Sequence, residues 1–275
     1  MKVLSLFSGI GAFEKALENL GISYELVAYC EIDKYASKSY AAIHGVPEIM
    51  NLGDITQIDE THLPGDIDLI TYGFPCQDIS IAGKQKGLFA EDGTHTRSGL
   101  FFEALRIIEK TQPRVAIAEN VKNLTGKRFA EQFKTVLESL EQAGYNNYWK
   151  VLNAKDFGIP QNRERVFIIS IRKDIDNGTF QFPKGFPLTL RLKDVLEPEV
   201  DEKYYISEAL PPHAIFRREQ EADETPKVKQ IGNLFPSKTR DNPNQGRLYD
   251  TDGLAPTLGA MQGGNRQPFV ITNDI

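Results

Sequence analysis

Up to Ile171, the chain alternates short apolar runs with longer amphipathic stretches, and this alternation is the feature that most limits the fold. The apolar runs have the length of buried strands, whereas the stretches between them have the apolar spacing of helices. A regular alternation of strands and helices is typical of a parallel sheet covered by helices on both faces. The sequence therefore predicts an α/β domain with a doubly wound sheet.

The pattern also gives approximate positions for the elements and for a domain boundary. After about residue 185, Pro, Gly and charged residues become frequent and helical spacing fades, which predicts a first domain over 1–185 and a smaller, irregular, β-containing domain over 186–275. The expected helices run from the Gly9–Gly11 turn to Leu20, and over Lys34–His44, Leu100–Lys110 and Phe129–Ala143. The expected strands are Val3–Phe7, Leu26–Cys30, one ending near Asp54, Asp68–Tyr72, Val115–Ala118, Tyr148–Asn153 and Val166–Ile171.

Charge and cysteine content restrict the function classes only partly. The net charge of −6 argues mildly against a nucleic-acid partner, although a local basic face can bind DNA on an otherwise acidic protein. The two cysteines fit neither a zinc site nor a disulfide framework, so we expect no metal and a reduced, cytoplasmic protein. No apolar run has the length of a membrane span, and the first residues are expected to form a buried strand, not a signal peptide.

A Ser-Gly-Ile-Gly turn after the first expected strand is a candidate ligand-binding turn. Gly9 and Gly11 let the backbone approach a ligand closely, at the start of a helix with free N–H groups. Glu31, at the end of the second expected strand, is placed to bind the two ribose hydroxyls of an adenosine, and Asp54 to accept from an adenine amino group. Glu14 stands where a dinucleotide fingerprint needs a third glycine, which favours an adenosine without pyrophosphate. A plain tight turn remains the alternative.

Three polar segments follow later strands and are candidates for the chemistry. Cys76 follows Pro75 at a strand end and is a candidate nucleophile, whereas Cys30, inside an apolar run, is expected to be an inert buried thiol. Glu119 comes after the next strand and is a candidate acid. Arg163 and Arg165 are two residues apart in an extended segment, which points them the same way. Each has a structural alternative: a buried thiol, a surface or capping glutamate, and an exposed charged turn.

Together these segments resemble one family, the C5-cytosine DNA methyltransferases. Pro-Cys-Gln combined with Glu-Asn-Val and Gln-Asn-Arg-Glu-Arg is a specific combination, and the likeness continues weakly through Arg247–Tyr249 and Ala255–Leu258. The resemblance implies a Rossmann-like class I methyltransferase domain followed by a target-recognition domain. The matching segments, in the family's order and spacing, are Phe7–Gly11, Cys30–Asp33, Gly53–Ile55, Gly73–Gln77, Glu119–Val121 and Gln161–Arg165.

The resemblance implies a mechanism and a role for each of these residues. Cys76 would add to carbon 6 of cytosine, Glu119 would bind N3, and Arg165 would hold the carbonyl oxygen and help to place Glu119, with Arg163 in the same site. S-adenosylmethionine would be the methyl donor. Its expected contacts are Phe7, Gly9, Gly11, Glu31, Ile32, Asp54, Ile55, Pro75 and Leu100, and the expected contacts to the cytosine are Gln77, Ser80 and Asn120.

Double-stranded DNA is the partner that the resemblance implies. Because carbon 6 is inaccessible in a stacked duplex, the cytosine would be flipped out, and Gln77–Arg97, with three glycines, is expected to close over it. The second domain would read bases in the major groove from a basic face. The candidate contacts there are Lys227, Lys229, Lys238, Arg240, Arg247 and Arg266, each of which is otherwise an ordinary solvated charge.

The chain departs from the family after Gly263–Arg266. Family members usually continue with an Arg-x-Leu-Thr-x-x-Glu-Cys segment and a Gly-Asn-Ser-Val segment that completes the cofactor pocket. Their absence allows a truncated chain, a split enzyme with a second polypeptide that supplies the missing part, or a silent copy that binds DNA without catalysis. It also predicts weak cofactor binding by the chain alone.

The sequence alone also allows other functions. A tRNA cytosine methyltransferase would use the same site chemistry and differ only in its substrate. A regulatory DNA-binding protein would need none of the chemistry. A thiol hydrolase would need a histidine base near Cys76, and none of His44, His62, His95 and His213 is convincingly placed.

Overall fold

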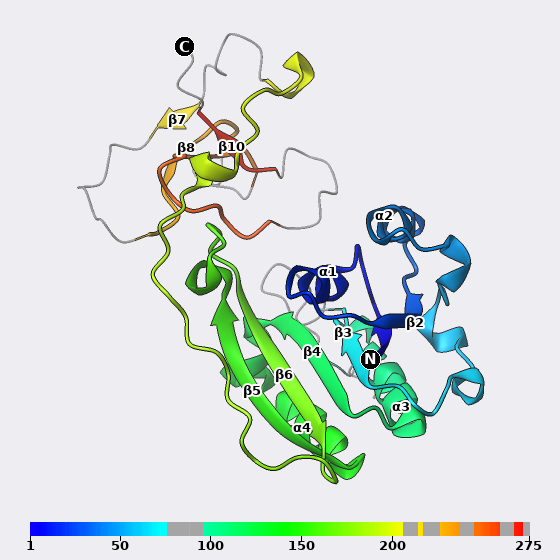
Figure 1. Cartoon of the computed structure of the whole chain (residues 1–275). Coiled ribbons are helices and arrows are strands. Elements are labelled where there is room, and N and C mark those ends of the chain that lie inside the picture. The colour runs from blue at the N-terminus through cyan, green and yellow to red at the C-terminus, as the bar shows by residue number, and fades with distance from the viewer. Residues whose placement is uncertain are drawn as a thin grey trace. The chain divides into compact units, whose positions relative to one another are not determined.

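The computed structural model describes residues 1–75, 88, 96–205, 214–216, 226–236, 245–258 and 267–271. These residues form two compact units (Figure 1). The first unit comprises Met1–Leu152 and Arg165–Phe182, and the second comprises Asn153–Glu164 and Pro183–Ile275. The segment before the last strand of the first unit therefore belongs to the second unit.

A six-stranded sheet forms the centre of the first unit. The first four strands in its spatial order are parallel, and β6 pairs antiparallel with β4. Because β1 has β2 on one side and β3 on the other, the chain reverses its direction of winding there, and the carboxyl ends of such strands form a binding crevice. The order is β2 (Glu25–Cys30), β1 (Lys2–Leu6), β3 (Leu69–Tyr72), β4 (Val115–Val121), β6 (Glu164–Arg172) and β5 (Tyr145–Asn153).

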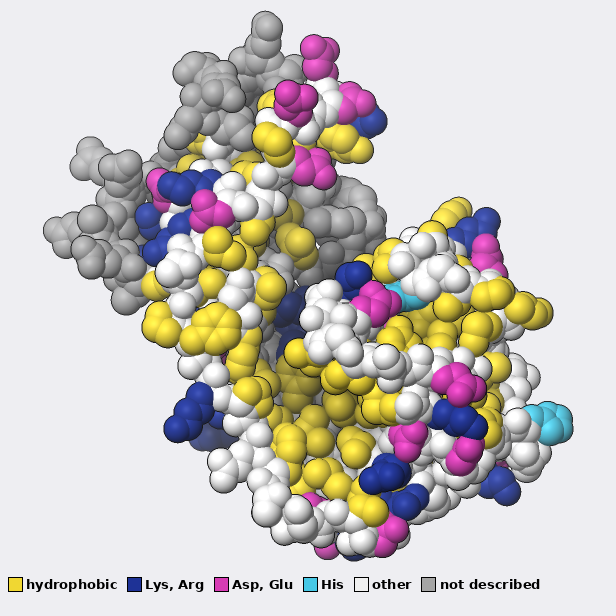
Figure 2. Space-filling model, viewed as in Figure 1, with side chains coloured by type: hydrophobic (Ala, Val, Ile, Leu, Met, Phe, Trp, Pro, Cys, Tyr) yellow, Lys and Arg dark blue, Asp and Glu magenta, His cyan; other side chains and the backbone are white. Residues whose placement is uncertain are grey.

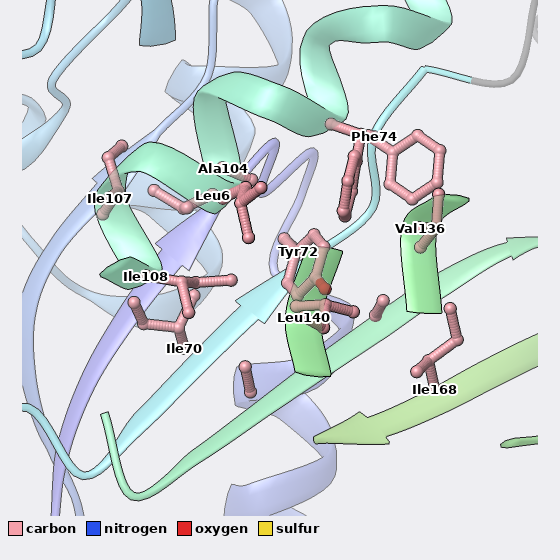
Figure 3. Close-up of a cluster of buried hydrophobic side chains, with 14 of the residues drawn as sticks. Leu6, Ile70, Tyr72, Phe74, Ala104, Ile107, Ile108, Val136, Leu140 and Ile168 are labelled. Atoms are coloured by element: carbon pink, nitrogen blue, oxygen red, sulfur yellow. The ribbon is translucent and has the colours of Figure 1, made fainter. Parts of the chain in front are cut away.

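Helices cover both faces of this sheet, as expected for a Rossmann-like α/β fold. Helices α3 (Phe101–Thr111) and α4 (Ala130–Gln142) pack their apolar stripes on one face, where they bury Leu6 and Tyr72 (Figure 3). On the other face, the ring of Tyr29 from β2 stacks on that of Tyr40 from α2 (Lys34–His44), with centroids 4.0 Å apart. Alternate side chains of a strand point to opposite faces, so a single strand packs against helices on both faces of the sheet. Helix α1 (Ala12–Asn19) links β1 to β2.

The strand expected to end near Asp54 is absent from the described residues 46–68, and that prediction was wrong. Short 3-10 helices, η1 (Glu48–Met50) and η2 (Ile55–Gln57), occupy the region, with one isolated bridge between Tyr29 and Asn51. The Asn51 side chain accepts from the Glu31 amide at 3.0 Å and donates to the Glu31 carbonyl at 2.9 Å. This side chain satisfies the backbone groups that a neighbouring strand would otherwise bond, so the sheet ends at β2.

Among the boundaries that differ from the sequence-based expectation, two bear on the candidate site. Strand β4 continues to Val121, so Glu119 and Asn120 lie within the strand and not after it. Strand β6 begins at Glu164 and runs antiparallel to β4, so Arg165 is also a strand residue. Polar residues lower the strand signal in both segments, and the pairing of β4 with β6 overrides it.

Among its described residues, the second unit contains a small four-stranded sheet and otherwise only short 3-10 helices, which agrees with the expected β-containing domain. Its loop Asn153–Glu164 is bonded to the segment around Ala255: Asn162 N–H donates to the Ala255 carbonyl at 2.9 Å, and Gln161 Nε2 to that of Pro256 at 3.1 Å. The strand order is β10 (Phe269–Val270), β9 (Arg247–Tyr249), β8 (Gln230–Asn233) and β7 (Ile215–Phe216).

Candidate functional site

The turn between β1 and α1 has an unusual backbone. Phe7, Gly9 and Gly11 have φ values of 52°, 56° and 85°, in the left-handed region. Glycine adopts this region at little cost, whereas Phe7 is a non-glycine residue held there by its surroundings. The Ser8 amide donates to the Cys30 carbonyl at 3.0 Å, which ties the turn to the end of β2. The backbone therefore passes tightly over the sheet edge where the sequence predicts a ligand.

Glu31 fixes the second side of this edge. Its Oε2 accepts from Gly9 N–H at 2.9 Å and its Oε1 from Asp33 N–H at 2.8 Å. The carboxylate thus joins the glycine turn to the start of α2. The neighbouring Ile32 side chain is 75% exposed, which is unusual for isoleucine and leaves an apolar surface beside the carboxylate. A carboxylate next to an exposed apolar side chain suits the ribose and base of a nucleoside.

Asp54 and Ile55 follow the isolated bridge at Asn51. Asp54 caps η2, with its carboxylate accepting from Thr56 N–H at 3.0 Å. The Ile55 side chain is 3% exposed and belongs to the core, so any ligand contact at this position would come from its backbone. The Cys30 thiol donates to the Gly53 carbonyl at 3.0 Å, and burial raises its pKa to about 12. Cys30 is therefore the inert structural thiol expected from the sequence.

The second part of the candidate site lies at the ends of β3, β4 and β6. After β3 the chain continues through Gly73, Phe74 and Pro75, and Phe74 is buried against Phe101 with ring centroids 5.5 Å apart. Leu100, at the start of α3, is half-buried beside this core. The expected nucleophile Cys76, its neighbours Gln77 and Ser80, and nearly all of the expected closing loop lie outside the described residues.

Glu119 and Arg165 form the charged centre of this second part. Arg165 Nε lies 2.8 Å from Glu119 Oε1, and the two side chains are 16% and 26% exposed. The antiparallel register pairs Val121 with Arg165 and Glu119 with Phe167, which places both charged side chains on one face of the sheet. A Cβ on Gly73 would lie 3.8 Å from Glu119 Oε2, so the turn after β3 passes directly beside the carboxylate.

Asn120 has a different place from the one expected. Its side chain is 3% exposed, its Nδ2 donates to the Phe74 carbonyl at 3.1 Å, and its Oδ1 accepts from Val121 N–H at 2.8 Å. These bonds hold the turn after β3 against β4. The structure therefore places Asn120 behind the turn that leads to Cys76, where it orients the backbone.

Arg163 belongs to the second unit. Its amide donates to Asn153 Oδ1 at 3.0 Å, and its carbonyl accepts from Ala154 N–H at 3.0 Å. The segment around Ala255, which resembles the family only weakly, is bonded to the loop that contains Arg163. Thr257 Oγ1 donates to the Asn162 carbonyl at 2.6 Å, a contact that no sequence pattern indicated.

The basic residues expected to face DNA are only partly described. Lys227, Lys229 and Arg247 are half-buried, and Lys229 Nζ lies 3.9 Å from an Asp250 carboxylate oxygen. Lys238, Arg240 and Arg266 lie outside the described residues. On the face drawn in Figure 2, the coloured Lys and Arg side chains are interspersed with Asp and Glu. This view therefore gives no extended basic patch.

Within the described part of the chain, no three His, Cys, Asp or Glu residues are grouped so that they could hold a metal ion. The same residues include no helix with the length and apolar character of a membrane span.

The comparisons with known proteins agree with the motifs. The profile of the C-5 cytosine-specific DNA methylase family matches residues 1–266. The chain is 39% identical to Orphan methyltransferase M.SPRI of Bacillus phage SPR, over 96% of this chain and 64% of that protein. It is 38% identical to Type II methyltransferase M.HhaI of Haemophilus parahaemolyticus, over 96% of this chain and 75% of that protein. The chain thus spans slightly less than two thirds of the phage relative.

A solved structure supports the fold. The chain aligns with a mutant form of Spodoptera frugiperda DNMT2 at a TM-score of 0.57 and 23% identity, over 74% of this chain and 61% of the other. At this level of identity, the likeness shows the fold alone.

Proposed function

Since the chain belongs to the family of C-5 cytosine-specific DNA methylases, we propose that it transfers a methyl group from S-adenosylmethionine to carbon 5 of cytosine in double-stranded DNA. The observation that carries the proposal is the Glu119–Arg165 pair beside the turn that leads to Cys76. An acid held by a guanidinium, beside the turn that leads to a candidate nucleophile, suits addition to a polarised ring.

The residues at the β1–β2 edge fit the cofactor. The Glu31 carboxylate would accept from the ribose hydroxyls, the exposed Ile32 side chain would pack on the adenine, and Gly9 and Gly11 would let the backbone approach the ligand. Phe7, Asp54, Ile55, Pro75 and Leu100 complete the proposed set. When bound, S-adenosylmethionine supplies an electrophilic methyl group.

We propose the following steps for the protein's own groups. The Cys76 thiolate forms a bond to carbon 6, and the electron pair of the 5,6 double bond becomes available at carbon 5. Glu119 holds or supplies a proton at N3, where charge develops, and Arg165 keeps the carboxyl group in place and binds the carbonyl oxygen. After methylation, a base such as water takes the carbon 5 proton, the electrons of that C–H bond restore the 5,6 double bond, and the bond from carbon 6 to sulfur breaks to release the Cys76 thiolate. Arg163, Gln77 and Ser80 are proposed to line the base pocket.

Access to carbon 6 requires a flipped cytosine, so we propose that Gln77–Arg97 closes over the extruded base. The second unit is proposed to read the target sequence, with Lys227, Lys229, Lys238, Arg240, Arg247 and Arg266 as candidate contacts. The comparisons give no support to a second polypeptide.

The test is transfer of radiolabelled methyl groups to unmethylated genomic DNA, because such DNA contains nearly every short target. We expect label in 5-methylcytosine with the wild-type chain and none with Cys76→Ser. Label that appears in tRNA but not in DNA would replace the substrate in this proposal. Full activity of Cys76→Ser would contradict the covalent mechanism. DNA binding without any methyl transfer would favour a silent copy.

A further inference from the structure

Behind the glycine turn lies a histidine that the motifs do not include. His44 is the last residue of α2, and its side chain is only 2% exposed. Its Nε2 lies 3.1 Å from the Ile10 carbonyl oxygen, and its Nδ1 lies 2.9 Å from Glu18 Oε1. The ring also packs on Tyr40, with centroids 4.6 Å apart. One side chain therefore connects α2, α1 and the turn between β1 and α1.

The chemistry of the Ile10 carbonyl fixes the direction of one of these hydrogen bonds. A backbone carbonyl oxygen only accepts, so Nε2 of His44 donates to Ile10, while Nδ1 contacts the Glu18 carboxylate of α1. Glu18 is ionised in this arrangement: His44, and then Lys15 at 3.0 Å, lower the Glu18 pKa to about 2. The same ring thus joins a backbone carbonyl of the turn to a carboxylate of α1.

The His44 ring fills the space beside Gly11. A Cβ on Gly11 would overlap the His44 imidazole, whereas a Cβ on Gly9 would meet nothing within 4 Å. Gly11 is therefore required both for its φ of 85° and for the space that the ring occupies. The Gly11 amide donates to the Ser8 carbonyl at 2.9 Å, so the glycine that admits the ring also closes the turn.

We propose that His44 is a positioning residue, which holds the Ser8–Gly11 turn in its ligand-binding conformation by donating from Nε2 to the Ile10 carbonyl. This inference rests on the proposed cofactor site, because the turn matters for activity only if the cofactor binds there. His44 itself lies behind the turn and is not assigned a contact with the ligand. The titratable groups that border His44 are Glu18 and Lys15 of α1 and Tyr40 of α2. Burial raises the pKa of Tyr40, and the nearby carboxylate of the buried Glu14 raises it further.

The segment that contains Asp54 and Ile55, which belongs to the same proposed cofactor site, is also bonded to a helix side chain. Arg106 of α3 donates from Nη2 to the Ile55 carbonyl at 3.2 Å and from Nη1 to the Ile58 carbonyl at 3.0 Å. Each loop thus has a helix side chain that donates to its backbone carbonyls from behind. The parallel supports a positioning role for His44, since an unrelated residue performs the corresponding task on the neighbouring loop.

Two substitutions separate the two bonds of the ring. In His44→Gln, the side-chain amide nitrogen reaches the position of Nε2 and keeps the bond to Ile10. In His44→Asn, the amide nitrogen reaches only the position of Nδ1, so the Ile10 bond is lost. Both variants lose the ring and its packing on Tyr40, so their thermal unfolding midpoints should fall by similar amounts. The pair therefore isolates the Ile10 bond from general stability.

Binding of S-adenosylhomocysteine to the full chain, measured by calorimetric titration, is the readout. We expect affinity to fall about 10-fold in His44→Asn, as for the loss of one hydrogen bond, and to stay within about 3-fold of wild type in His44→Gln. Equal losses in the two variants would overturn the inference, because the ring would then act through packing alone.

A second readout separates this inference from the proposed function. Amide hydrogen exchange of Gly11 should be faster in His44→Asn than in His44→Gln, whether or not any ligand binds. If the wild-type chain fails to bind S-adenosylhomocysteine, the proposed cofactor site is contradicted and the exchange rates still decide whether His44 holds the turn. Identical exchange in the two variants would overturn the positioning role.

Discussion

The two parts of the candidate site, at the β1–β2 edge and at the ends of β3, β4 and β6, are built in different ways. At the first edge, backbone groups are tied to nearby polar side chains: Gly9 to Glu31, Glu31 to Asn51 and Ile10 to His44. At the second, strand register brings together Glu119 and Arg165, which are far apart in sequence and remain partly exposed. The first edge is thus held by bonds between side chains and backbone, whereas the second presents a partly exposed charged pair; we propose that the first binds the cofactor and that the second carries the chemistry.

If this contrast is correct, substitutions at the second edge reduce turnover and leave cofactor affinity unchanged. Glu119→Gln keeps the size of the side chain but removes its ability to supply a proton. We expect the rate of methyl transfer at saturating cofactor to fall by roughly 10²- to 10⁴-fold, the usual contribution of a general acid. Calorimetry with S-adenosylhomocysteine provides the control. If the affinity for S-adenosylhomocysteine fell as much as the rate, Glu119 would also support cofactor binding, and the proposed difference between the two edges would be wrong.

The reciprocal change lies at the first edge. Glu31→Gln weakens acceptance of the Gly9 and Asp33 amides and of the proposed ribose hydroxyls. Because hydrogen bonds to a charged group contribute about 1.5–3 kcal/mol, cofactor affinity should fall by roughly 10- to 100-fold. Turnover measured at saturating cofactor should change little. A reduced maximal rate with unchanged affinity would place Glu31 in the chemistry instead.

Asn120 tests how the second edge is supported. Asn120→Ala leaves the Phe74 carbonyl and the Val121 amide without their side-chain partner in a buried position, so unfolding free energy should fall by about 1–3 kcal/mol. Asn146→Ala, which removes an exposed amide bonded to Asp176 at 2.7 Å, is the matched control and should cost less than about 0.5 kcal/mol. Urea unfolding of both variants gives the comparison, and equal costs would refute the supporting role.

The sequence predicted the architecture well because each strand and helix carries its own apolar period. It placed α2 at Lys34–His44, where Asp33 caps the first turn and Gly45 ends the helix with φ of 62°. It failed near Asp54, because the Asn51 side chain replaces a strand through contacts with Glu31, which is 20 residues away. No local pattern reveals that substitution.

In the candidate site, too, the sequence indicated some residues and missed those whose role depends on contacts with distant segments. The motifs marked Glu31, Glu119 and Arg165, whose side chains are proposed to bind the cofactor and to act on the base. They did not mark His44 or Arg106, which act on backbone carbonyls of other segments, and they did not show that Asn120 faces the backbone of Phe74. Supporting contacts depend on which segments the fold brings together, so they become visible only in three dimensions.

The smallest expected effect is on the pH dependence of folding stability, through the contact between Glu18 and His44 behind the β1–β2 edge. The Glu18 carboxyl has a pKa of about 2 in the folded chain against an ordinary value of 4.5, mainly because of His44 and secondarily because of Lys15. A lowered carboxyl pKa stabilises the fold above the ordinary value, and this contribution is lost as the pH falls from about 4.5 towards about 2.

Glu18→Gln should therefore make urea stability decline less steeply than in wild type between about pH 5 and about pH 3. Lys15→Met, which keeps the larger His44 interaction, should flatten the decline only slightly. The effect is modest because the Glu18 side chain is 33% exposed and solvent screens its interactions. A wild-type slope in Glu18→Gln would mean that the carboxylate gains nothing from His44, and the first edge would then depend on the Ile10 bond alone.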